Sequence, residues 1–191
     1  MKITGYEDLR VQRTINSIYQ SFEELVCEKD YAKITVTELA KRAQINKKTF
    51  YRYYETLDDL LAELQARYAE GYLKEIEDYQ YPQDLEKSVA AFFEYSAKQG
   101  EAFDRITTST NYTGIRQQMV NQVMSKTWGQ SSAFNRLNDW EKKVLLEFIQ
   151  QTGLTIYQEW IREGRQQPLD NLISEAQTLM RGGVDNYLKS K

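Results

Sequence analysis

The side chains best suited to chemistry in this sequence lie between residues 41 and 54. Within residues 47–54, Lys47, Lys48 and Tyr51 fall on about one turn of a short expected helix, where they can point together at base edges and phosphates. Cations are disfavoured at the start of a helix by its dipole, so two lysines there call for an anionic partner. The stretch 41–54 holds five basic residues and no acidic one: Lys41, Arg42, Lys47, Lys48 and Arg52. This pattern indicates binding to nucleic acid.

Hydroxyl groups surround these lysines. Thr49, Tyr51 and Tyr53 offer hydroxyls to phosphate oxygens, and Thr37 is placed to reach the DNA backbone from the preceding helix. Arg52 can contact DNA from the side of the groove. The alternative for Tyr51 and Tyr53 is half-buried packing, and for Lys41 and Arg42 it is a solvated face with a long-range electrostatic effect. The predicted DNA-binding residues are Thr37, Lys47, Lys48, Thr49, Tyr51, Arg52 and Tyr53.

Two short helices are needed to position these groups. The first is expected at residues 37–43, where a Thr caps a segment that buries Leu39 and Ala40. A tight turn at residues 44–45 precedes Asn46, a good N-cap for a second helix ending near residue 54. Phe50 and Tyr54 are four residues apart and share the face that would hold this helix against its neighbours.

The rest of the chain also shows helical spacing, because apolar residues recur every three or four positions and alternating strand patterns are nearly absent. Helices are expected near residues 9–28, 57–79, 89–100, 102–107, 115–123, 139–163 and 169–188. Residues 107–113 and 126–138 look like loops, the second anchored by aromatic residues. Thr56 and Asp59 have the spacing of a capping box. The predicted fold is all-α with about nine helices.

The glycine pair at residues 182–183 would interrupt the last helix. Each glycine costs about 1 kcal/mol relative to alanine inside a helix. We consider two explanations: a close approach of helices at a dimer interface, or a break in the helix. The aromatic residues of the C-terminal region are expected to be mostly core, and a subset would line a ligand cavity. They are Phe92, Phe93, Tyr95, Phe103, Trp128, Phe134, Phe148, Tyr157 and Trp160.

Charge is distributed unevenly along the 191 residues. The net charge is −3, yet residues 1–56 hold ten Lys and Arg against eight Asp and Glu, whereas residues 57–191 hold fifteen against twenty. A small basic domain that binds nucleic acid, joined to a larger acidic domain, explains this difference. We therefore expect a DNA-binding domain at residues 1–56 and a larger effector-binding and dimerisation domain at residues 57–191.

Composition argues against several classes of protein. The sequence has no histidine, which removes the usual base of nucleophilic sites and the commonest transition-metal ligand, and its carboxylates fall in no catalytic motif. We expect no enzyme activity, metal or cofactor. No apolar stretch approaches the ~20 residues of a membrane span, and the first residues lack a signal core. The lone cysteine, Cys27, fits a reducing compartment, so a cytoplasmic protein is expected.

The helix-turn-helix segment resembles the DNA-binding signature of the TetR family of bacterial regulators. The resemblance rests on Thr-Val-Thr-Glu-Leu-Ala-Lys-Arg-Ala at residues 35–43 and Ile-Asn-Lys-Lys-Thr-Phe-Tyr-Arg-Tyr-Tyr at residues 45–54, followed by Leu60 and Leu61. It covers about fifty residues. It implies a homodimer with recognition helices in successive major grooves of double-stranded DNA, and a C-terminal domain that binds a small-molecule effector.

Three positions depart from the family pattern. Gln44 stands where the family usually has Gly, which predicts a less sharp or strained turn. Tyr53 replaces a common His. Leu57 replaces a Lys that often contacts phosphate, and two aspartates follow it, so we expect no phosphate contact at Leu57.

The sequence therefore predicts a ligand-responsive transcriptional regulator, in most such proteins a repressor, that binds a near-palindromic operator as a homodimer. The alternative is a helical co-activator or protein-interaction partner without its own inducer. An enzyme on the same scaffold has no motif in its favour.

Overall fold

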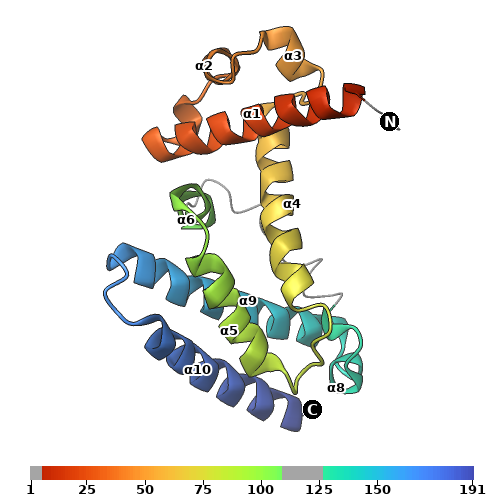
Figure 1. Ribbon diagram of the computed structural model, residues 1–191. Coiled ribbons are helices and arrows are strands. Elements are labelled where there is room, and N and C mark those ends of the chain that lie inside the picture. Colours follow the sequence, from red (N-terminus) through yellow and green to blue (C-terminus); the bar gives the residue numbers. More distant parts are fainter. Residues whose placement is uncertain (1–5, 109–126) are drawn as a thin grey trace. The chain divides into compact units, whose positions relative to one another are not determined.

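The computed structural model describes residues 6–108 and 127–191 (Figure 1). All regular structure in these residues is helical, which confirms the all-α prediction. The elements are α1 (Tyr6–Glu28), the 3₁₀ helix η1 (Tyr31–Lys33), α2 (Val36–Arg42), α3 (Lys47–Tyr51), α4 (Leu57–Glu75), α5 (Leu85–Ala97), α6 (Glu101–Thr108), α8 (Ser132–Asn135), α9 (Asp139–Arg162) and α10 (Leu169–Lys189). The helix predicted at residues 115–123 lies outside the described residues. So does most of the loop predicted at 107–113, whose first two residues belong to α6.

The chain forms two compact units, residues 1–66 and 67–191, and the border between them falls within α4. We refer to them as the N-terminal and the C-terminal unit. The sequence suggests a different border, after residue 56, between a DNA-binding domain and an effector-binding and dimerisation domain. That assignment of functions stays a prediction. No helix among the described residues is long and apolar enough to span a membrane.

Local side-chain caps set where the short helices of the N-terminal unit begin. The Asn46 side chain accepts a hydrogen bond from the Thr49 amide at 2.8 Å, as predicted. Thr56 and Asp59 form the predicted capping box, with bonds of 2.8 and 3.1 Å between each side chain and the other residue's amide. The start of α2 differs from the prediction, because its cap is Thr35, whose hydroxyl accepts from the Glu38 amide. The helix therefore starts at Val36, one residue earlier than predicted.

Two predicted helix ends also differ from the structure. Helix α3 ends at Tyr51, three residues before the predicted end, and α4 ends at Glu75 instead of residue 79. In both cases the apolar pattern continues beyond the helix, because Tyr54 and Ile76 are buried although they follow the last helical turn. Burial alone is therefore a poor guide to where a helix stops.

The C-terminal unit is a helical bundle in which α10 packs against both α5 and α9 (Figure 1). Its core includes Phe93, Trp128 and Tyr157, each fully buried. The segment 126–138, predicted as a loop, contains the short helix α8, and it is tied to the core by Trp128, Phe134 and Leu137. Most of the aromatic residues predicted as core are buried, and Phe148, which is 39% exposed, is an exception.

The last helix runs without a break through Gly182 and Gly183. A Cβ added at Gly183 would meet the Phe148 ring at 2.6 Å, so glycine there allows the close approach of α9 to α10. A Cβ at Gly182 would meet nothing within 4 Å. The broken-helix alternative is therefore wrong, and Gly182 has no close packing neighbour among the described residues.

The Tyr157 hydroxyl joins three parts of the C-terminal unit. It donates to the Asp104 carboxylate of α6 at 2.5 Å and lies 3.1 Å from the Ser96 carbonyl oxygen of α5. Arg165, just beyond α9, holds the other oxygen of Asp104 at 2.5 Å. Burial, followed by the hydrogen bond to Asp104, raises the pKa of Tyr157 well above its usual value, so the hydroxyl remains a donor at any ordinary pH.

The turn between α2 and α3 depends on Gln44, whose φ is +55°. This left-handed conformation costs a residue with a Cβ roughly 1–2 kcal/mol. The strain predicted for Gln44 is thus present, and the turn is still tight: the Ile45 amide donates to the Ala40 carbonyl at 2.9 Å.

Replacing Tyr157 with Phe should lower the free energy of unfolding of the C-terminal unit by about 1–3 kcal/mol, because Asp104 and the Ser96 carbonyl lose a buried donor. Urea unfolding followed by tryptophan fluorescence measures this unit alone, since Trp128, Trp140 and Trp160 all belong to it. Tyr187→Phe, which removes a weaker 3.5 Å bond, is the control. Equal losses in both variants would contradict the assignment.

Replacing Gln44 with Gly should stabilise the helix-turn-helix by up to about 1 kcal/mol, because glycine adopts a positive φ without steric cost. Hydrogen exchange of the α2 and α3 amides measures the gain. Gln44→Ala keeps the Cβ and should leave protection unchanged. Lower protection in Gln44→Gly than in Gln44→Ala would show that the turn is not strained.

Candidate DNA-binding surface

Helix α3 has only five residues, so it depends on contacts with the rest of the N-terminal unit. Phe50 is fully buried and Tyr54, four residues on, is 4% exposed, as their spacing predicts. The two rings lie 5.7 Å apart between centroids. Burying two aromatic side chains contributes several kcal/mol and fixes which face of α3 points outward.

A chain of hydroxyl groups extends this anchor to α1 and α4. The Tyr54 hydroxyl donates to the Tyr19 hydroxyl of α1 at 3.3 Å, and Tyr19 in turn donates to the Glu63 carboxylate of α4. Burial, followed by the bond to Tyr19, raises the pKa of Tyr54 far above its usual value. Tyr54 thus stays neutral, and the end of α3 is tied to two longer helices.

The predicted DNA-binding residues are displayed on the opposite side from this anchor. Lys47, Lys48 and Arg52 are exposed, and the Tyr51 side chain is 54% exposed although it is a large aromatic group. Thr37 is exposed on α2, whereas Thr49 and Tyr53 are half-buried. The Thr49 hydroxyl lies 3.0 Å from the Asn46 side chain, so part of its hydrogen-bonding capacity serves the cap.

The three cations of α3 and its C-cap carry unneutralised charge. Among the described residues, no carboxylate forms an ion pair with Lys47, Lys48 or Arg52. The helix start also presents the free amide groups that favour an anion. This arrangement can bind phosphate oxygens and base-edge acceptors, and it suits no reaction chemistry.

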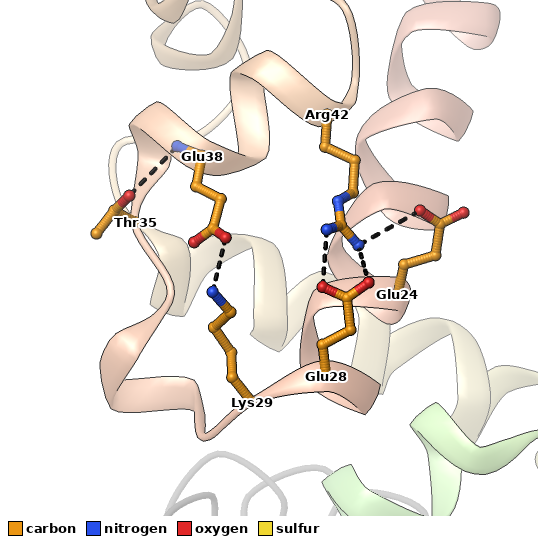
Figure 2. Close-up of polar contacts among 6 residues, drawn as sticks. All are labelled: Glu24, Glu28, Lys29, Thr35, Glu38 and Arg42. Atoms are coloured by element: carbon orange, nitrogen blue, oxygen red, sulfur yellow. Dashed lines mark hydrogen bonds and ion pairs between the residues drawn. The ribbon is translucent and has the colours of Figure 1, made fainter.

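Ion pairs hold α2 against α1 at the other side of the motif (Figure 2). Arg42 makes two hydrogen bonds to Glu28, at 2.5 and 2.7 Å, and lies 3.7 Å from Glu24. Lys29 binds Glu38 at 2.7 Å. Arg42 lies at the surface, as the predicted solvated face implies, but its charge is also used to position α2, which the prediction did not include. The hydrogen bond from Arg42 lowers the pKa of Glu28, so this pair stays charged at neutral pH and weakens only in acid.

The sequence analysis predicted the helix caps but not the pairs between helices that position α2 and α3. Glu28 and Arg42 are fourteen residues apart and Tyr19 and Glu63 are forty-four apart, so no helical spacing connects them. A weak signal existed for Glu28, because it ends α1 with an exposed carboxylate facing a basic stretch. The described residues hold no group of His, Cys, Asp and Glu that could bind a metal ion.

Comparison with known proteins shows a family similarity for the region that carries this surface. Residues 17–64, which include all of α2 and α3, match the family described as bacterial regulatory proteins, tetR family. A relative from Bacillus subtilis (strain 168), the uncharacterized HTH-type transcriptional regulator YxbF, is 36% identical over 55 residues. That alignment covers 28% of this chain and only 14% of the relative.

Solved structures extend the similarity of fold beyond this region. A TetR transcriptional regulator from Streptococcus agalactiae 2603V has a TM-score of 0.68 at 20% identity, covering 91% of this chain and 97% of its own. FadR from Bacillus subtilis, in complex with stearoyl-CoA, has a TM-score of 0.68 at 14% identity, covering 86% and 96%. In its helix-turn-helix region, residues 17–64, the chain is therefore similar to the bacterial regulatory proteins of the tetR family, and its fold is similar to that of these solved regulators.

Proposed function

We propose that this protein is a ligand-responsive transcriptional regulator that binds a near-palindromic operator as a homodimer and represses transcription. The observation that carries the proposal is the outward face of α3, where Lys47, Lys48 and Tyr51 are exposed on a helix whose other face is locked by Phe50. Thr37, Thr49, Arg52 and Tyr53 complete the proposed contact set. Lysines and tyrosine at the start of a recognition helix read base edges and bind phosphates in the major groove.

Homodimerisation is supported by the surface of α9 and α10. Three large apolar side chains on these helices are exposed: Trp140 at 72%, Leu179 at 60% and Phe148 at 39%. Such a concentration on two adjacent helices is typical of an interface. We propose that α9 and α10 of two subunits form a four-helix bundle there, with Gly182 admitting the partner's helix. A twofold dimer then presents two α3 helices to two half-sites.

The effector is proposed to bind the C-terminal unit. The support is the fold shared with FadR, whose structure contains stearoyl-CoA. An effector that changes the separation of the two recognition helices moves them away from the ~34 Å spacing of successive major grooves and lowers affinity. The same fold also occurs in the dihydroxyacetone kinase operon activator DhaS, at a TM-score of 0.53. Activation is therefore the second candidate output, and a promoter fusion with and without the protein separates the two.

The double substitution Lys47→Ala/Tyr51→Ala should weaken binding to a selected genomic fragment at least about 30-fold, because each base or phosphate contact contributes about 1–3 kcal/mol. Fluorescence anisotropy with the DNA around the protein's own gene measures the affinity. Lys33→Ala, on the same unit and outside the proposed surface, is the control for lost charge. Selective binding that survives the double substitution would contradict the role of α3.

Replacing Gly182 with Gln should weaken the dimer at least about tenfold, because the new side chain meets open space within one chain but a partner helix in the proposed bundle. The same change should stabilise the isolated chain slightly, since glycine is a poor helix former. Sedimentation equilibrium measures the dissociation constant. Gly100→Gln, at another glycine with open space around its Cβ, is the matched control. An unchanged dimer in Gly182→Gln would exclude this face.

A further inference from the structure

The cations of the N-terminal unit divide into two groups. Lys29, Lys33 and Arg42 each form an ion pair, with Glu38 at 2.7 Å, Asp30 at 3.5 Å and Glu28 at 2.5 Å respectively. A second group is exposed and has no ion pair among the described side chains: Arg10, Arg13, Lys41, Lys47, Lys48 and Arg52. Two of these, Arg10 and Arg13, lie on α1, outside the helix-turn-helix that the proposed function uses.

Helical spacing places these two arginines on one face of α1. Arg10, Arg13 and Ser17 follow each other at intervals of three and four residues, so they share a stripe along the helix. The Ser17 hydroxyl donates to the carbonyl oxygen of Ala43 at 3.0 Å. That carbonyl directly precedes the turn that leads into α3. The stripe therefore faces the side of α1 on which the recognition helix starts.

Arg10 and Arg13 lie farther toward the N-terminus of α1 than Ser17, on the side of α1 where α3 starts. Arg13 lies about 6 Å and Arg10 about 10 Å before Ser17 along the axis. In the view of Figure 1, α2 is drawn above the C-terminal half of α1, and α3 is drawn nearer to the N-terminus of α1 than α2 is. The contacts follow the same order, because Arg42 of α2 pairs with Glu28 at the end of α1, whereas Tyr54, after α3, bonds to Tyr19, nine residues closer to the N-terminus of α1.

We propose that Arg10 and Arg13 bind phosphate oxygens of the DNA backbone beside the groove that α3 enters. The inference rests on the proposed function and extends its contact surface onto α1. A guanidinium forms paired hydrogen bonds with a phosphate, and its long side chain reaches from a helix that does not itself enter the groove. Such contacts add affinity and register without reading sequence. The paired cations at the far end of α1 contribute nothing comparable, because Glu28 and Glu38 neutralise them.

The salt dependence of DNA binding tests this assignment. We would measure the affinity of the full chain for two duplexes, one selected by the wild-type protein from random sequence and one scrambled, between 50 and 200 mM salt. Each lost phosphate contact lowers the slope of log affinity against log salt by about 0.9. Arg10→Gln/Arg13→Gln removes four contacts from a dimer on the selected duplex, so its slope should fall by about 3.6. Wild-type affinity should then drop about 150-fold more than the variant's over this range.

Three variants complete the test. Lys33→Gln removes a charge that is already paired and should leave the slope unchanged. Arg10→Lys/Arg13→Lys keeps the charge and should restore most of the slope. Lys47→Gln/Lys48→Gln measures the recognition helix independently. Circular dichroism checks that each variant is folded.

The outcomes separate this inference from the proposed function. A lower slope on both duplexes, restored by lysine, supports phosphate contact. An unchanged slope in Arg10→Gln/Arg13→Gln, with a lower one in Lys47→Gln/Lys48→Gln, overturns the inference and leaves the proposed function standing. Loss confined to the selected duplex would assign the arginines to base reading and also overturn it. A folded wild-type protein that binds neither duplex overturns both proposals.

Discussion

The burial of Phe50 and Tyr54 is the constraint on which the rest of the proposed DNA-binding surface depends. A helix of five residues is unstable in water, because too few hydrogen bonds offset the cost of starting it. These two rings hold it from one side, and the Asn46 cap fixes its first turn. With that face buried, Tyr51 and Arg52 between the two rings point outward, whereas Tyr53 is half-buried. Packing thus determines which positions of α3 are exposed. The side-chain types at those positions do not take part in that packing.

Charge is divided within the N-terminal unit in the same way. Acidic partners neutralise the cations where α2 rests on α1, and these pairs serve to position helices. Around α3 the cations lack such partners among the described side chains. Because these pairs neutralise the cations near α2, the unpaired positive charge of the unit is concentrated around α3. A chain with a net charge of −3 can therefore still present a cationic surface.

Local signals predicted most of the fold, because the chain contains helices whose apolar spacing and caps lie within a few residues of each other. The Asn46 cap, the Thr56–Asp59 box and the buried pair Phe50 and Tyr54 are of this kind. The sequence left open which threonine caps α2, because two threonines stand two residues apart and both suit the position, and the structure shows Thr35. For the same reason, the seven predicted contact residues came from a local motif, and their DNA contacts remain a prediction.

Contacts between distant residues could not be predicted. Three such contacts depend on how helices pack. They are the pairing of Arg42 with Glu28, the bond from Tyr19 to Glu63 and the close approach of the Phe148 ring to Gly183. Nothing in one helix specifies its partner on another. The glycine pair illustrates this: Gly182 and Gly183 are adjacent in sequence, yet one fills a packing need within the chain and the other faces open space.

The most direct test of the account is to recover DNA bound by the wild-type protein from a random pool and to map its protection by hydroxyl-radical cleavage. The account predicts an inverted repeat, with two protected half-sites whose centres lie one helical turn, or a whole number of turns, apart on the same face of the duplex. An enriched sequence with a single half-site would contradict the twofold arrangement. No enrichment by a folded protein would contradict the central claim that α3 reads DNA.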